Sequence, residues 1–175
     1  DADLDLAADG ILWSAFGTTG QRCTACSRVV VEASVREPLL RRLVDRAAAL
    51  RLGDGLRDGV DVGPLVNEPA RSKVEEYVGV GSGEGRLLTG GHRASGAGLE
   101  HGHFFEPTIF DGVLPMARIG QEEIFGPVLS VIPVEDYAAA VAAVNGTRYG
   151  LSSSIYTRDV NTAFRAMRDF TTGIV

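Results

Sequence analysis

The chain has 175 residues, 45% of them hydrophobic and 23% charged, which is enough for one globular domain with a hydrophobic core. Its formal net charge of −6 disfavours nonspecific binding to nucleic acid or to an anionic membrane, because both attract basic surfaces. No apolar run approaches the roughly 20 residues that cross a bilayer, and the first residues are acidic where a secretory leader is basic. Two cysteines are too few for a disulfide framework, so the reducing cytoplasm is the expected compartment.

Helical and strand patterns alternate along the chain. In chain order, they predict a helix from the cap residue Asp3 towards residue 16, a strand over residues 28–32, helices over 35–50 and 68–78, a strand over 86–89, an extended segment over 104–110, a strand over 128–134, a helix over 135–144, a strand over 152–156, a helix over 159–170 and a strand from 173. This alternation predicts one α/β domain whose mostly parallel sheet carries helices on both faces.

A glycine-rich stretch follows the third predicted helix. Residues 79–85 invite a phosphate-loop interpretation, but they follow no strand and match neither GxGxxG nor GxxxxGK[ST]. We therefore expect a flexible surface turn there.

Cys23 is the first candidate for chemistry. It lies in the segment 20–25 (GQRCTA), directly after Arg22 and before Thr24. A thiolate is the strongest nucleophile that a protein carries, and a neighbouring cation increases the reactive fraction of a thiol. The alternative is a buried structural cysteine, the commonest state of a free thiol in a core. The polar neighbours argue against that alternative but leave it open.

Cys23 and Cys26 also form a CxxC pair, which suggests a metal or dithiol site. One such pair is half of a zinc site, and the three histidines, His92, His101 and His103, lie in glycine-rich loops without ligand spacing. A dithiol pair is chemically possible, but the segment lacks the aromatic and proline neighbours of thioredoxin-type motifs. No metal site is predicted.

Glu122 and Glu123 are adjacent carboxylates that could serve in acid–base chemistry. Neighbouring residues on a helix or strand point in different directions, so at most one of them faces a site. Spacing alone favours a solvated helix end, with Ile124 and Phe125 packed inward.

Five segments, in this order, resemble the catalytic domain of the aldehyde dehydrogenase superfamily. They are residues 16–25 (FGTTGQRCTA), 63–67 (GPLVN), 105–109 (FEPTI), 123–127 (EIFGP) and 149–155 (YGLSSSI). The resemblance extends, in the same order, over nearly the whole chain. The combination of GQRCT and LSSSI resembles a subgroup that includes amino-acid-derived semialdehyde dehydrogenases.

The resemblance implies roles for particular residues. Cys23 would attack an aldehyde to give a thiohemiacetal, and its backbone N–H would hold the oxyanion. Hydride transfer to NAD or NADP would leave a thioester that water hydrolyses. Glu123 would hydrogen-bond the nicotinamide ribose, Phe125 would pack against the nicotinamide end, and Lys73 would add a ribose contact.

Arg22 and Thr24, which flank the nucleophile, are candidate substrate contacts. A guanidinium grips a carboxylate through two hydrogen bonds, which suits a semialdehyde with a distal acid. The alternative is that Arg22 only biases the thiolate or pairs with a carboxylate of the protein.

Several parts of such an enzyme are absent from these residues. The resemblance places the general-base glutamate, the side-chain amide of the oxyanion hole and the dinucleotide-binding domain upstream, and the oligomerisation hairpin and final segment downstream. Residues 1–175 are therefore expected to be a catalytic-domain fragment that is inactive alone, from a protein that forms a homo-oligomer when complete. Two alternatives stay open: an acylating relative that passes the thioester to coenzyme A, and a non-catalytic assembly subunit.

Overall fold

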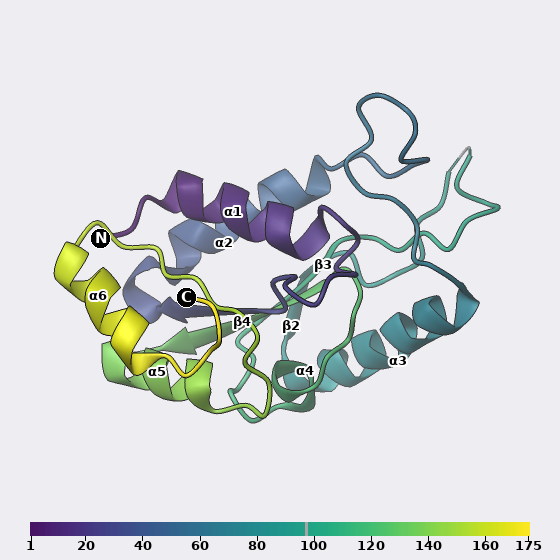
Figure 1. The fold of residues 1–175 in the computed structure, drawn as a ribbon. Coiled ribbons are helices and arrows are strands. Elements are labelled where there is room, and N and C mark those ends of the chain that lie inside the picture. The colour runs from purple at the N-terminus through teal and green to yellow at the C-terminus, as the bar shows by residue number, and fades with distance from the viewer. Residues whose placement is uncertain (97) are drawn as a thin grey trace.

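The computed structural model describes residues 1–96 and 98–175 and contains a four-stranded sheet between layers of helices (Figure 1). In spatial order, the strands are β1 (Arg28–Glu32), β4 (Val128–Val134), β3 (Thr108–Asp111) and β2 (Arg86–Thr89). Both β1 and β3 run parallel to β4, whereas β2 is antiparallel to β3. The mostly parallel sheet expected from the sequence is confirmed.

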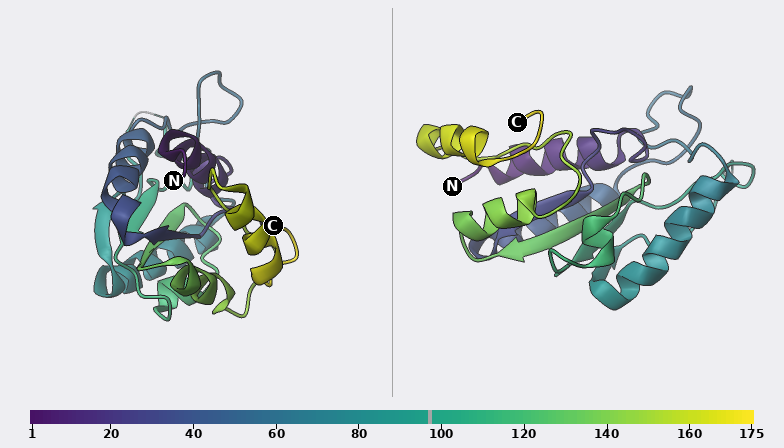
Figure 2. Two further views of the ribbon diagram at one scale, coloured as in Figure 1. Left: turned by 90° about the vertical axis from the view of Figure 1, so that its left-hand side faces the viewer. Right: turned by 60° about the horizontal axis from the view of Figure 1, so that its bottom comes forward.

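Helices cover both faces of this sheet (Figures 1 and 2). One face carries α1 (Leu4–Phe16) and α2 (Ala33–Ala48), and the other carries α3 (Glu68–Glu84), α4 (Arg118–Gln121) and α5 (Tyr137–Asn145). The last helix, α6 (Val160–Asp169), is joined to the first residue of α5 by a hydrogen bond from Tyr137 to Asp169. Among the described residues, none of the helices combines the length and the apolar character that crossing a bilayer requires.

The two faces of the sheet support separate hydrophobic clusters. Val29 and Val31 of β1 belong to the cluster under α1 and α2, while Val30 packs against the cluster under α3 and α5. This follows from strand geometry, because successive side chains point to opposite faces. A strand buried on both sides needs a continuous apolar run, which the sequence supplies in β1 and β4.

The strands at residues 28–32, 86–89 and 128–134 have the bounds expected from the sequence. The strands expected at residues 152–156 and from 173 do not form. Between them there is one parallel bridge, Ser152 to Ile174, outside the sheet. Residues 152–157 instead border a cavity beside β1, so they pair with no sheet strand.

The flexible turn expected at residues 79–85 is also wrong, because α3 continues through it to Glu84. Gly81 is buried, and a Cβ built on it would lie 2.7 Å from the ring of Phe110 in β3. The missing side chain is what allows the helix backbone to approach the sheet this closely. Glycine here serves packing, whereas the sequence pattern suggested chain flexibility.

Asp111, at the end of β3, joins three elements. Its buried carboxylate accepts a hydrogen bond from Arg36 Nε of α2 at 2.8 Å and one from Arg86 of β2 at 3.0 Å. Burial tends to raise the pKa of the Asp111 carboxyl, but the hydrogen bonds and charges of the two arginines outweigh it and hold the pKa below its usual value. A charged carboxylate therefore fixes the edge strand β2 and α2 to the sheet.

The packing of α3 predicts opposite effects for two alanine substitutions. Gly81→Ala should lower the free energy of unfolding by about 1–3 kcal/mol, because its Cβ would overlap the Phe110 ring. Gly83→Ala is the matched control in the same helix. It has nothing within 4 Å of the new Cβ and should raise the free energy of unfolding by about 0.5–1 kcal/mol. Urea denaturation measures both, and equal stability of the two variants would contradict the close packing.

Candidate active site

Cys23 lies at the surface, on a turn between α1 and β1. The turn closes through hydrogen bonds from Gln21 N to Thr18 O and from Ala25 N to Arg22 O, both 3.0 Å long. Cys23 lies within the second of these turns and is exposed. The helical pattern ends where the first helix was expected to end, and the next residues present the thiol to solvent.

Residues 63–66 hold this turn from the side. The Thr19 hydroxyl donates to Gly63 O at 3.0 Å. The Gln21 side chain bonds this segment twice, donating to Pro64 O at 3.3 Å and accepting from Val66 N at 2.9 Å. The family-like segment 63–67 therefore supports the family-like segment 16–25 through hydrogen bonds.

The cysteine turn also contacts the segment 121–126 directly, backbone against backbone. Gly20 has a φ of +67°, and a Cβ placed on it would lie 2.0 Å from Gly126 O. Only glycine fits both the left-handed backbone and this approach. The two motifs, about a hundred residues apart in sequence, are thus in contact.

In the segment 121–126, side chains alternate between inside and outside. Glu123 is exposed and Ile124 is buried. Phe125 is 42% exposed and has a φ of +59°, a backbone conformation that is rare and strained for a bulky residue. The inward packing considered for Phe125 is wrong, whereas that of Ile124 is correct. The ring is held outward beside an exposed carboxylate.

Glu122 is partly exposed, and its side chain is bound by residues of α3 and α4. Its carboxylate accepts a hydrogen bond from the Tyr77 hydroxyl at 2.6 Å and one from Arg118 Nε at 2.7 Å. The Tyr77 bond, followed by the Arg118 bond, keeps the pKa of the Glu122 carboxyl below its usual value. The two glutamates have separate surroundings, as their adjacency predicts.

A cavity of about 660 Å³ runs from the cysteine turn along β1. Of the candidate site residues, those that border it are Arg22, Cys23, Thr24, Glu123 and Phe125. Lys73 does not border it. Its ammonium group donates to the backbone carbonyl of Glu123 at 2.8 Å, so Lys73 contacts the site from α3.

Arg22 is positioned by an aromatic ring. Its guanidinium carbon lies 4.3 Å from the ring centroid of Trp13, within the range of a cation–π contact. Arg22 Nε is buried and has no hydrogen-bond partner within the described part of the chain. The guanidinium is oriented, and one of its donors is unused.

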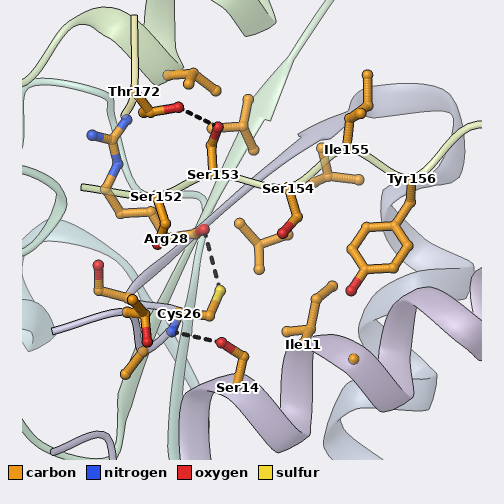
Figure 3. A pocket seen from close by; sticks show the side chains of 18 of the residues that line it. Ile11, Ser14, Cys26, Arg28, Ser152, Ser153, Ser154, Ile155, Tyr156 and Thr172 are labelled. Carbon is orange, nitrogen blue, oxygen red and sulfur yellow. Dashed lines mark hydrogen bonds between the residues drawn. The ribbon is translucent and has the colours of Figure 1, made fainter. Parts of the chain in front are cut away.

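Cys26, whose surroundings are shown in Figure 3, is less exposed than Cys23. Its N–H donates to Ser14 Oγ at 3.1 Å, and its thiol donates to Arg28 O at 3.5 Å. Burial raises the pKa of the Cys26 thiol to about 11. Across residues 1–96 and 98–175, no group of three or more His, Cys, Asp or Glu side chains is arranged to hold a metal ion.

Comparison with known proteins places this geometry in a family. The sequence model described as the aldehyde dehydrogenase family matches residues 1–175, the whole chain. The chain belongs to the aldehyde dehydrogenase family.

Among related aldehyde dehydrogenases, the α-ketoglutarate semialdehyde dehydrogenase of Haloferax volcanii is 44% identical over 170 residues, 97% of this chain and 35% of that protein. A Thermus 1-pyrroline-5-carboxylate dehydrogenase solved with bound NAD is 44% identical, with a TM-score of 0.93 over 99% of this chain and 33% of that one. Betaine aldehyde dehydrogenase from Staphylococcus aureus in complex with NAD+ is 34% identical, with a TM-score of 0.97 over 100% of this chain and 35% of that one. The chain spans about a third of the length of the curated relatives it matches.

Some contacts in this aldehyde dehydrogenase site have no local sequence signal. In the sequence, Gln21 is only a polar neighbour of the cysteine, and Tyr77 has no evident role. Their partners are 43 to 45 residues away in the chain, so residue spacing could not reveal them. Membership of a shared motif was the available signal for Gln21, and for Tyr77 there was only its spacing of four residues from Lys73 on one helix face.

The contrast between the two thiols is directly measurable. Iodoacetamide at pH 8 should alkylate Cys23 well before Cys26, because Cys23 is exposed and a thiol of pKa about 11 is about one part in a thousand thiolate. Peptide mass spectrometry of the folded protein follows each site, with Cys26→Ser as the control that removes only the slow reaction. Equal rates at the two cysteines would contradict the assignment of separate environments.

Proposed function

We propose that the protein carrying this chain oxidises an aldehyde to a carboxylic acid with NAD or NADP, through a covalent intermediate on Cys23. One observation carries the proposal. The exposed Cys23 lies on a turn whose backbone packs against the segment holding Glu123 and Phe125, and all three residues border one cavity. A nucleophile and a candidate nicotinamide contact therefore share one site. The oxidations named in its relatives support the same reaction class.

The chemistry begins with the Cys23 sulfur. As thiolate, it bonds to the carbonyl carbon, and the carbonyl oxygen takes the negative charge, which the backbone N–H of Cys23 stabilises. The nicotinamide ring, when bound, accepts the hydride that leaves this carbon, and with it the two electrons of the oxidation. The resulting thioester carbon then accepts the oxygen of water and loses the sulfur. This releases the acid, passes the second proton of the water to the general base or to solvent, and restores the Cys23 thiolate.

The residues present fit a nicotinamide nucleotide. The exposed Glu123 carboxylate offers acceptor oxygens to ribose hydroxyls, and the outward ring of Phe125 offers an apolar surface to the nicotinamide. Lys73 uses one ammonium proton on the Glu123 carbonyl and keeps two for a ribose contact. NAD is the favoured nucleotide, because two similar solved structures contain it.

We further propose that residues 1–175 form the cysteine-bearing catalytic domain. They supply the nucleophile and the Glu123–Phe125 contact to the cofactor. The general base, which decides between water and coenzyme A as the thioester acceptor, and the main dinucleotide-binding domain belong to other parts of the protein.

The proposed substrate is an aldehyde with a distal carboxylate. Arg22 borders the cavity next to Cys23, is oriented by Trp13 and has an unused buried donor, Nε. An oriented guanidinium with free donors suits a carboxylate. Two relatives named above, those for 1-pyrroline-5-carboxylate and α-ketoglutarate semialdehyde, act on substrates whose names denote an acid.

Removing the Cys23 nucleophile should abolish the reaction. In the full-length protein, Cys23→Ala should reduce aldehyde-dependent NADH formation by about a thousandfold or more, because no covalent intermediate can form. Cys26→Ser should leave the rate close to that of the unaltered protein, since its thiol is only partly exposed and donates to Arg28 O. Absorbance of NADH measures both. An unchanged rate in Cys23→Ala would rule out the proposed nucleophile, and a protein with an unreactive Cys23 would fit an assembly subunit.

Arg22 tests the substrate class. Arg22→Ala should lower kcat/KM for an acid-bearing aldehyde by about tenfold to a hundredfold more than for a neutral aldehyde of equal length, because only the former loses a charge-assisted pair. Arg165→Ala is a matched control, since Arg165 also stacks on an aromatic ring, at 4.4 Å from Tyr137. An equal fall for both aldehydes would leave Arg22 without a role in carboxylate recognition.

A further inference from the structure

Three residues on one face of α3 hold the segment that leads into the candidate cofactor site. Lys73, Tyr77 and Glu84 are separated by four and seven residues, which places them on a common face of the helix. Each of them contacts the segment 118–123.

The contacts begin at the N-terminal end of α4. The two carboxylate oxygens of Glu84 accept the backbone N–H groups of Arg118 and Ile119, both at 2.9 Å. This satisfies two of the donors that a helix start leaves unpaired. At the other end, Tyr77 binds the Glu122 side chain, and the Glu122 N–H bonds to Arg118 O at 2.9 Å. A helix of four residues has little stability of its own, so α3 sets its position.

The position of α4 and Glu122 determines where the following residues, 123–125, lie. Glu123 follows Glu122 directly, and its carbonyl is bound by Lys73 at 2.8 Å. Phe125 comes two residues later in a left-handed conformation that persists only where its surroundings impose it. Glu122, directly before Glu123, is held by side-chain hydrogen bonds from Tyr77 and Arg118.

We propose that the Tyr77–Glu122 hydrogen bond is a positioning pair for the nicotinamide nucleotide, holding Glu123 and Phe125 in the orientation that binds it. The inference rests on the proposed function above. Neither Tyr77 nor Glu122 is required to touch the cofactor. They act through the backbone of residues 122–125.

Arg118 explains why the tyrosine hydroxyl matters. Arg118 stacks over the Tyr77 ring, with 4.9 Å from its guanidinium carbon to the ring centroid, and donates to Glu122. It also donates to Glu76, the residue before Tyr77 in α3, at 3.3 Å. Arg118 is therefore shared between two carboxylates, whereas the Tyr77 bond goes to Glu122 alone. Without the Tyr77 hydroxyl, the remaining side-chain donor to Glu122 is Arg118, which can bond to Glu76 instead.

The test uses Tyr77→Phe in the full-length protein, which removes the hydroxyl and keeps the ring. KM for NAD should rise about fivefold while kcat stays within about twofold, the effect of losing one hydrogen bond to a charged group that acts on binding. Tyr137→Phe is the matched control. Tyr137, on α5, also donates to a carboxylate, that of Asp169 on α6, at 3.2 Å. Its melting temperature should fall as much as that of Tyr77→Phe, with KM for NAD unchanged.

A double-mutant cycle identifies the pair. Glu122→Ala should raise KM for NAD at least as much as Tyr77→Phe, and the double variant should bind NAD no more weakly than Glu122→Ala alone, because the bond is already lost. Additive effects, or an equal KM in Tyr77→Phe and the unaltered protein, would overturn the positioning role. Direct titration with NAD separates the two proposals. An unaltered protein that binds NAD but oxidises no aldehyde contradicts the proposed function alone, and one that binds no NAD contradicts both.

Discussion

The candidate site depends on the close approach of Gly20 to Gly126. Cys23, the proposed nucleophile after α1, and the Glu123–Phe125 pair before β4 become one site only if their loops touch, and the touching surfaces are two backbones. Any side chain at Gly20 would displace one loop from the other. The left-handed conformation of Gly20 and the braces from Thr19 and Gln21 keep the turn in this contact.

The sheet provides the frame for this contact. The parallel pairing of β1 with β4 sets the ends of these two strands side by side, so the cysteine turn that leads into β1 and the segment 121–126 that leads into β4 enter the sheet at the same edge. The Asp111 carboxylate secures α2 and β2 to the same sheet, and Gly81 lets α3 pack near enough for Lys73 and Tyr77 to reach residues 122 and 123. Gly81 and the buried carboxylate of Asp111 therefore influence the position of the candidate cofactor contacts without touching them.

The sequence predicted those features that depend on local patterns. The β-branched run of β1 and the apolar run of β4 gave the observed strand bounds, because burial on both faces leaves little freedom in residue type. The glycines of α3 were misread because local propensity disfavours helix there, while packing against Phe110 favours glycine. Residues 152–156 have strand composition but lie beside the cavity, where no strand pairs with them. The strained backbone of Phe125 and the Tyr77–Glu122 bond come from tertiary contacts, which no residue spacing records.

The environment of Cys26 has a consequence for oxidative damage. When an exposed cysteine is oxidised to a sulfenic acid, a nearby thiolate can resolve it as a disulfide, which cellular thiols later reduce. Cys26 is three residues from Cys23, but burial raises the pKa of its thiol to about 11, and the thiol donates to Arg28 O. It is a poor resolving partner at neutral pH. Recovery of an oxidised Cys23 therefore depends on a soluble thiol from solvent, which the exposure of Cys23 admits.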